Sequence, residues 1–420
     1  MVTERDAWAV LASVHGLGQA TFALLLREHG SARRVVELAV SEVGRRLIRD
    51  GPLPDGRRSL PQTTVDGLTA AATDAPTVVA RLRADGVTVL TIDDEGYPLR
   101  LRTIEEPPHV LFVRGAPEAL GAAHAIAIVG TRRPSESGRR VAARIADAVT
   151  RLEAVVVSGL AVGIDGAAHA AAVAASRPTV AVLGSGHDRL FPQAHARLAG
   201  AIVETGGAVV SELPPDATPT RGTFPRRNRL ISGLADATVV VEAAARSGAL
   251  ITARWALEQG RGCFLVPGSI DAPTAAGCLA FLRLFAGEAR IVAGVAELID
   301  DLGLLESTSD TTGRPATGPS REAILALLGD SEARVAAALV DGAATVDELA
   351  ERTELAVAAV LGTLTMLEMR DLVTSAYGRY RPAGALAGLA PEFALRREPV
   401  LRFRAIDEAA SSDQTAARSR

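Results

Sequence analysis

The chain has 420 residues, of which 48% are apolar and 22% are charged, and 45 basic against 49 acidic side chains leave a net charge of −4. The apolar share excludes a wholly disordered chain, and the weakly acidic balance excludes a uniformly basic nucleic-acid binder while leaving room for a local basic patch. Two cysteines, Cys263 and Cys278, are too few for a disulfide scaffold or a Cys-rich zinc module. All the basic residues are arginine, and aromatic residues make up only 3%.

The sequence shows no recognisable membrane-spanning helix or secretory signal. No apolar run approaches the ~18 residues that a membrane-spanning helix needs. The N-terminal residues MVTERDAWAV lack the apolar core of a secretory signal. We therefore expect a cytoplasmic protein without a membrane partner, and the length predicts more than one domain.

Residues 1–75 are predicted to form an N-terminal helical domain. The segment from Trp8 to Leu26 contains a Gly-Leu-Gly turn at 16–18 between two apolar stretches, which is typical of two helices joined by a tight turn. Such a helical hairpin either packs as part of a small bundle or presents its backbone amides to a DNA phosphate. The sequence favours the first interpretation and leaves the second open.

Residues 76–303 are predicted to form an α/β domain built on a parallel sheet. Short apolar runs, each followed by glycine or a polar turn, alternate with alanine-rich helical stretches. The predicted strands are Ala125–Val129, Ala154–Val157, Thr179–Leu183, Ala208–Val210, Thr238–Val241 and Cys263–Val266. Strands that are apolar throughout indicate a sheet buried on both faces.

A Ser/Thr/Gly/Pro-rich linker at 304–320 leads to a smaller domain at 321–383, and a tail occupies 384–420. In the smaller domain Thr345 is a candidate N-cap for a helix over Val346–Arg352, and a longer helix is predicted over Ala356–Arg370. A hairpin is predicted from Leu372–Ser375 and Arg379–Pro382. This order of elements is typical of a winged helix-turn-helix.

Glycine-rich turns follow the predicted strands, at the edge of a parallel sheet where ligands bind. Glycine lets a backbone approach an anion, and helix N-termini supply free amides. A final turn of this kind is Pro267-Gly268. Together the turns predict a phosphate-rich ligand, and the candidate contacts in them are Gly130, Thr131, Arg132, Ser158, Gly159, Gly163, Gly184, Gly186, Ser247 and Gly248.

A second candidate region is the segment 220–229, predicted to be a loop, in which four arginines surround one phenylalanine and no acidic residue occurs. Guanidinium groups pair with phosphates, and an aromatic ring can stack on a base. The candidate contacts are Arg221, Phe224, Arg226, Arg227, Asn228 and Arg229. The alternative is a solvated arginine face beside a buried ring.

Enzymatic interpretations find less support. Asp165 and His169 are four residues apart on a predicted helix, as an acid–base pair or half of a metal site would be, but no third ligand or nucleophile has suitable spacing. We interpret them as structural, with Asp165 capping the helix and His169 hydrogen-bonded in the packed turn. Neither a GxGxxG fingerprint nor a Walker A loop is present, so no cofactor or metal is expected. Cys263 is expected to be buried and inert.

These motifs together resemble the DNA-processing protein A (DprA, or Smf) family. The resemblance is dense over about 95–300. It rests on Ile128–Arg132, Ser158–Asp165, Ala168-His169, Ser211-Glu212, Phe224–Leu234, Ser247–Ala253 and Pro267-Gly268, with Tyr97-Pro98 and Pro107-Pro108 at the entry. One departure is Leu279, which stands where the family usually has asparagine.

The resemblance implies an extended Rossmann-like domain flanked by an N-terminal helical domain of the SAM or helix-hairpin-helix type and a C-terminal winged helix. It implies a non-enzymatic recombination mediator that binds and protects single-stranded DNA, helps to load RecA recombinase onto it during natural transformation, and acts as a homodimer. Arg132 matches the family's phosphate-binding arginine, Phe224 its base-contacting aromatic residue, and Arg221 a basic residue three positions earlier.

Two other functions remain as alternatives. A Rossmann-like nucleoside monophosphate hydrolase should carry PGGxGTxxE, but the corresponding region Ser247–Ala253 has no matching glutamate. A transcription factor would read duplex DNA with the helix Ala356–Arg370, yet that helix carries few basic residues and has acidic neighbours. A protein contact is at least as compatible with that helix.

Overall fold

The computed structural model describes residues 2–50, 59–220, 222–304, 325, 328–340, 345–370, 372–376, 379–382 and 386. These residues belong to two compact units, Met1–Thr312 and Gly313–Arg420. The predicted linker from residue 305 onward and nearly all of the predicted tail lie outside the described residues. In the described part of the chain, no helix is both long and apolar enough to cross a lipid bilayer.

The first unit begins with helices that share one apolar core. They are α1 (Glu4–Ala12), α2 (Gln19–His29), α3 (Ala32–Ala39), α4 (Glu42–Arg49), α5 (Gln62–Thr73) and α6 (Ala75–Ala84). Thr3 and Asp6 form a capping box at the start of α1, and Gly16 turns the chain toward α2 with a φ of 85°. The core around Trp8 also includes Phe112 from the sheet, so these helices pack directly on it.

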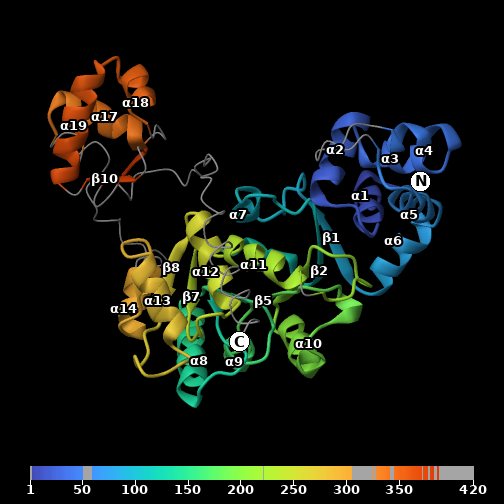
Figure 1. The fold of residues 1–420 in the computed structure, drawn as a ribbon, viewed down its shortest axis with the longest axis horizontal. Coiled ribbons are helices and arrows are strands. Elements are labelled where there is room, and N and C mark those ends of the chain that lie inside the picture. Colours follow the sequence, from blue (N-terminus) through green and yellow to red (C-terminus); the bar gives the residue numbers. More distant parts are fainter. Residues whose placement is uncertain are drawn as a thin grey trace, which may run out of the picture. The chain divides into compact units, whose positions relative to one another are not determined.

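A nine-stranded sheet runs through the middle of the first unit (Figure 1). Its strands are β1 (Val87–Thr91), β2 (Val110–Gly115), β3 (Ala125–Val129), β4 (Val155–Ser158), β5 (Thr179–Val182), β6 (Ala208–Ser211), β7 (Ala237–Val240), β8 (Gly262–Leu265) and β9 (Arg290–Ile291). The order is β1-β2-β6-β5-β4-β3-β7-β8-β9. The strands from β6 to β9 in this order are parallel, which confirms the prediction.

The sheet is not parallel throughout, because β1 and β2 extend it on one side. β2 pairs antiparallel with β1 and with β6. These two strands were not predicted, and the purely parallel description is corrected to a mixed sheet. The extension matters for the fold, because it is the part of the sheet on which the N-terminal helices pack.

Helices cover both faces of the sheet. One face is covered by α7 (Leu99–Arg102), α11 (Thr223–Gly233), α12 (Ala249–Glu258) and α13 (Ala276–Leu284), and the other by α8 (Glu136–Arg151), α9 (Ile164–Ala174), α10 (Ala196–Glu204) and α14 (Val295–Asp301). Within β3, Ala127 and Val129 enter the first core, while Ile126 and Ile128 enter the second. Burial on both sides explains why the strand reads as one continuous apolar run.

The second unit contains the predicted winged helix. Its described elements are α17 (Asp330–Val340), α18 (Val346–Thr353), α19 (Val357–Met369), β10 (Val373–Ala376) and β11 (Arg379–Pro382). Thr345 caps α18 in a capping box with Glu348, as its position suggested. Helix α17 was not predicted. The two strands pair as an antiparallel hairpin, and Leu364 and Leu367 of α19 enter the core.

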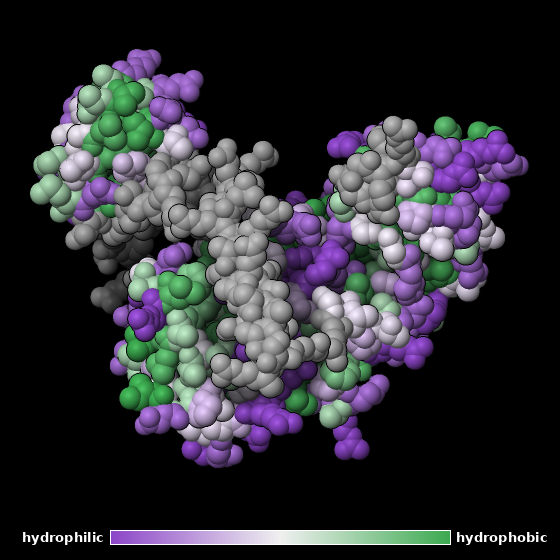
Figure 2. Space-filling model, viewed as in Figure 1, coloured by the Kyte–Doolittle hydropathy of each residue, from purple (hydrophilic) through white to green (hydrophobic). Residues whose placement is uncertain are grey.

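The outer face of α19 is apolar. Met369 is 76% exposed, and Val357, Leu361 and Met366 are also exposed. Glu368 is the one charged residue between Val357 and Met369. Figure 2 shows apolar residues gathered at the surface of this unit.

Candidate nucleic-acid interface

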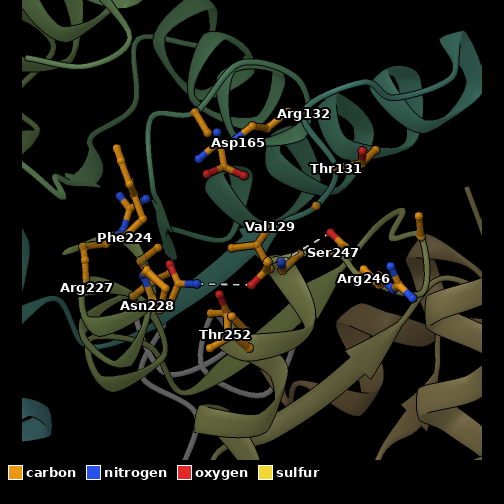
Figure 3. A pocket seen from close by; sticks show the side chains of 18 of the residues that line it. Val129, Thr131, Arg132, Asp165, Phe224, Arg227, Asn228, Arg246, Ser247 and Thr252 are labelled. Atoms are coloured by element: carbon orange, nitrogen blue, oxygen red, sulfur yellow. Dashed lines mark hydrogen bonds between the residues drawn. The ribbon is translucent and has the colours of Figure 1, made fainter. Parts of the chain in front are cut away.

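A cleft of about 790 Å³ opens at the carboxyl end of β3, between α11 and the start of α12 (Figure 3). It brings together the predicted residues Gly130, Thr131, Arg132, Phe224, Arg227, Asn228, Ser247 and Gly248. It is not lined by Ser158, Gly159, Gly163, Gly184, Gly186, Arg226 or Arg229. Arg221 lies outside the described residues.

The loop between β3 and α8 is held by Glu242, which follows β7. The backbone oxygen of Glu242 accepts the N–H of Thr131 at 2.7 Å, and its carboxylate accepts the N–H and the hydroxyl of Ser135 at 3.0 Å each. The Ser135 hydroxyl in turn accepts the N–H of Gly138 and caps α8. These bonds fix the loop and leave Arg132 exposed on it.

The glycines of the loops pack against the protein's own chain. A Cβ atom would come closer than 3.0 Å to a neighbouring atom at Gly130, Gly159, Gly163, Gly184 and Gly186. Gly163 also has a φ of 95°, which residues with a side chain rarely adopt. Gly248, by contrast, has no such atom within 4 Å. Packing against the chain therefore explains glycine at the five crowded positions, and contact of their backbone with an anion stays a prediction.

The segment predicted as an arginine-rich loop is largely helical. Helix α11 begins at Thr223, so the successive arginines point in different directions around its axis. Arg226 is exposed, and its guanidinium lies 3.9 Å from the carboxylate of Glu106. Asn228 reaches across the cleft, where its side-chain amide donates to the backbone oxygen of Gly248 at 3.2 Å.

Arg227 points into the protein from α11. It is 5% exposed, and its guanidinium donates to the backbone oxygen of Gly159 at 2.8 Å and to that of Val182. Burial lowers the pKa of Arg227 to about 10, so the side chain stays charged near neutral pH. Because those carbonyls follow or end β4 and β5, this one side chain ties both strand ends to α11.

Arg229 is also directed inward, at 2% exposure, and it pairs with Glu212. Burial raises the pKa of the Glu212 carboxyl, and the guanidinium of Arg229 opposes that shift. We call Arg227 and Arg229 the buried arginines. Their burial corrects the interpretation of the whole segment as a solvent-facing surface.

Asp165 and His169 also lie within the protein. The Asp165 carboxylate accepts the N–H of Gly159 at 3.1 Å, and the amides of Ala161 and Gly130 also donate to it. Burial raises the pKa of Asp165, whereas Arg227 and these amides oppose the rise. Gly163, not Asp165, occupies the N-cap of α9, which corrects the predicted capping role. The amides of Gly130 and Gly159 are thus engaged by a side chain of the same protein.

His169 is fully buried beside the same loops. The hydroxyl of Thr179 donates to the backbone oxygen of Val156, so it accepts the proton of His169 Nδ1 across 2.8 Å. Burial lowers the pKa of His169 to about 3, and the ring is neutral at physiological pH. In the described part of the chain, no cluster of three or more His, Cys, Asp or Glu side chains is placed to hold a metal ion.

The open side of the cleft carries two exposed arginines and an aromatic pair. Arg132 lies over the ring of Phe224, 5.5 Å from its centroid, and the ring of Phe191 lies 5.6 Å from that of Phe224. Arg246 lies on the opposite side, beyond Ser247 (Figure 3). We call Arg132 and Arg246 the rim arginines. Both are exposed, and no described carboxylate forms an ion pair with either.

Three contributors to this cleft were missed in the sequence. Arg246 directly precedes the predicted Ser247-Gly248 turn, and Phe191 follows the Gly184-to-Gly186 turn, so their places on the same sheet edge were available signals. Glu242 does not line the cleft but holds one of its loops, and its place directly after the predicted strand Thr238–Val241 was the same kind of signal. Leu279, the departure from the family pattern, lies in the first turn of α13 and does not line the cleft.

Comparisons with known proteins show which family the chain resembles. The family described as DNA recombination-mediator protein A matches residues 88–303, and the DprA winged helix domain matches residues 311–379. A DNA processing protein DprA of Bacillus subtilis is 40% identical over 208 residues, which are 50% of this chain and 70% of the relative.

Similarity also extends over nearly the whole chain. A protein of Mycobacterium tuberculosis named as a DNA processing protein DprA is 35% identical over 398 residues, covering 91% of this chain and 96% of the relative. The X-ray structure of DNA processing protein A from Streptococcus pneumoniae is 28% identical with a TM-score of 0.56, and the match covers 71% of this chain and 98% of that one.

Proposed function

Because this chain belongs to the DNA recombination-mediator protein A (DprA/Smf) family and has a role in DNA processing, we propose that its cleft binds single-stranded DNA. We further propose that it protects the strand and helps to load RecA onto it, as in natural transformation. The observation that carries the proposal is the pair of rim arginines beside an exposed aromatic ring at the carboxyl edge of the sheet.

The charge presented by the cleft suits a polyanion. The rim arginines are exposed and have no ion-pair partner among the described residues, so their charge is available to a phosphate. The acidic groups nearby, Asp165 and Glu242, are buried, and their carboxylates accept hydrogen bonds from the protein's own backbone amides. A phosphate approaching the rim therefore meets positive charge first.

Contacts of this kind favour single strands over duplex DNA. Arginines that bind phosphates do not distinguish one base from another. An exposed aromatic ring can stack only on a base that is not already paired and stacked in a double helix. The sequence preference should therefore be weak. We expect fewer phosphate contacts than the arginine-rich segment suggested, because Arg227 and Arg229 are occupied within the protein.

The remaining parts of the proposal follow the family. We propose that the protein acts as a homodimer in the cytoplasm, contacts RecA, and performs no catalysis. The division into domains at 1–75, 76–303, 304–320, 321–383 and 384–420 stays a prediction. Nucleoside monophosphate hydrolysis is disfavoured, because Asp165 and Glu242, the carboxylates next to the cleft, are already engaged in holding its loops.

A binding titration tests the proposal. The full chain would be titrated against labelled oligo-dT of about 20 nucleotides and the matching duplex, each at two salt concentrations. We expect a clear preference for the single strand, and a fall in affinity with salt of about 0.7 logarithmic units per phosphate contacted. Arg132→Ala should weaken binding and flatten the salt dependence by about that amount.

Two results would contradict the proposal. Equal or tighter binding of the duplex, unaffected by Arg132→Ala, would move DNA binding away from the cleft. Absence of binding to either oligonucleotide would leave the cleft without a nucleic-acid role. RecA loading is tested separately, by measuring whether the chain accelerates RecA filament assembly on a single strand.

A further inference from the structure

The ring of Phe224 is partly covered by its neighbours. A Cβ atom on Gly184 would lie 2.9 Å from Phe224 Cδ1, so this ring packs directly against the backbone at Gly184. The guanidinium of Arg132 lies over the ring at 5.5 Å from its centroid. Phe224 is only partly exposed as a result. The ring on which the sequence places base stacking is therefore less exposed than that of Phe191.

The neighbouring ring of Phe191 is open. Phe191 is 45% exposed and lines the cleft, which makes it unusual in a chain with few aromatic residues. Its ring meets that of Phe224 at 5.6 Å between centroids and an interplanar angle of 59°. This tilted contact braces one side of Phe191 against Phe224, so the exposed part of the ring is held in place without being covered.

We propose that Phe191 is a second ring on which an unpaired base stacks, next to Phe224 and braced by it, with Arg132 holding a phosphate of the same strand. The inference rests on the proposed single-strand binding and adds this ring to the base contact expected at Phe224. Exposure alone does not single out Phe191, because isolated apolar residues are common at protein surfaces; its place in the cleft and its contact with Phe224 do. The cation at Arg132 and the ring at Phe191 both meet Phe224, which places a charge and a stacking surface next to each other.

The proposal separates base contacts from phosphate contacts, and this separation can be measured. A strand made of abasic sugar-phosphate units keeps its phosphates and has no base to stack. Loss of the Phe191 ring should therefore weaken binding of oligo-dT and leave binding of the abasic strand unchanged. Loss of Arg132 should weaken both, because it acts on the phosphates.

The experiment compares the full-length wild type, Phe191→Ala, Phe191→Tyr and Arg132→Ala on oligo-dT and on an abasic strand of equal length. We expect Phe191→Ala to lower affinity for oligo-dT roughly tenfold, within the range for one stacked base, with an unchanged salt dependence. Phe191→Tyr keeps a ring and should bind like the wild type. Phe191→Leu, which keeps apolar bulk against Phe224, guards against loss through misfolding and should behave like Phe191→Ala.

The outcomes distinguish the two proposals. Wild type that binds oligo-dT with the expected salt dependence, together with full affinity in Phe191→Ala, would overturn the role of Phe191 alone. An equal loss on both strands would also overturn it, because the effect would not involve a base. Wild type that binds neither strand would overturn the proposed function, and the inference with it.

Discussion

The buried arginines and the rim arginines lie at the same edge of the sheet and use the same side chain in opposite ways. Arg227 and Arg229 are removed from water, and one terminal nitrogen of each guanidinium donates to acceptors of the protein: two carbonyl oxygens for Arg227 and the Glu212 carboxylate for Arg229. Arg132 and Arg246 are exposed and have no ion-pair partner among the described residues. A buried charge without partners is very costly, so inward-facing arginines must be satisfied by the fold, and only the outward-facing ones are free for a ligand.

The largest effect is expected from a buried arginine. Arg229→Ala leaves the Glu212 carboxylate buried without its partner and should lower the free energy of unfolding by about 3–5 kcal/mol. Urea or thermal unfolding of the full chain measures this. Arg226→Ala is the matched control on the same helix, since its exposed guanidinium lies 3.9 Å from Glu106, and it should cost at most about 1 kcal/mol. Equal stability of the two variants would remove the distinction between inward and outward arginines on α11.

Acidic pH should lower the stability of the fold through groups buried near Arg227 and should leave DNA binding by the rim arginines unchanged. The pKa of His169 is lowered to about 3 by burial, with His195 and Arg227 adding to the shift, whereas the unfolded chain takes up that proton near 6.5. Between these values the unfolded state holds more protons, so the free energy of unfolding falls as the pH drops below about 6.5, by about 1.4 kcal/mol per pH unit. His187, whose pKa is lowered to about 4, acts in the same direction.

Unfolding at pH 7 and pH 5 checks this expectation. His169→Gln removes one titrating group and should show a difference between the two pH values smaller by about 2 kcal/mol. An identical pH dependence in the variant and the wild type would show that His169 takes up its proton in the folded state. Arginine side chains in general keep their charge in proteins, so strand binding by the folded protein should change little between these pH values.

A smaller effect is expected from the second rim arginine. Arg246→Ala should lower affinity for oligo-dT by about tenfold at low salt and reduce the salt dependence by about 0.7 logarithmic units, without loss of stability. Arg144→Ala removes another exposed arginine, from α8 outside the cleft, and should leave both quantities unchanged. If the two variants bind alike, Arg246 does not contact the strand.

The smallest effect is expected from Arg370 in the winged helix. This arginine follows α19 and is half exposed, but its guanidinium lies 2.8 Å from the Glu332 carboxylate, so its charge is already paired. Arg370→Ala should change duplex affinity less than about twofold, as an exposed ion pair contributes little. A large loss of duplex binding, measured by fluorescence anisotropy, would instead give α19 a DNA-contacting role.

The sequence was most informative where local pattern decides structure. The run Ala125–Val129 is β3 as predicted, and Thr345 caps α18, because strand burial and helix capping depend on neighbouring residues. The antiparallel strands β1 and β2 were missed, although β2 begins with the buried apolar run 110–113. What that run does not give is the direction and partner of its pairing, since Val113 pairs antiparallel with Val210 far along the chain. No local signal announces a partner so distant.

Within the site, the sequence by itself determined the edge of the sheet, the arginine-rich segment and the family to which the chain belongs. Only the tertiary structure decided which arginines face water. A helical turn places neighbours such as Arg226 and Arg227 about 100° apart, and the position of α11 against the sheet buries one and exposes the other. It also decided that Phe191 and Arg246 join the cleft, because contacts between separate loops arise when the strands align and not from spacing along the chain.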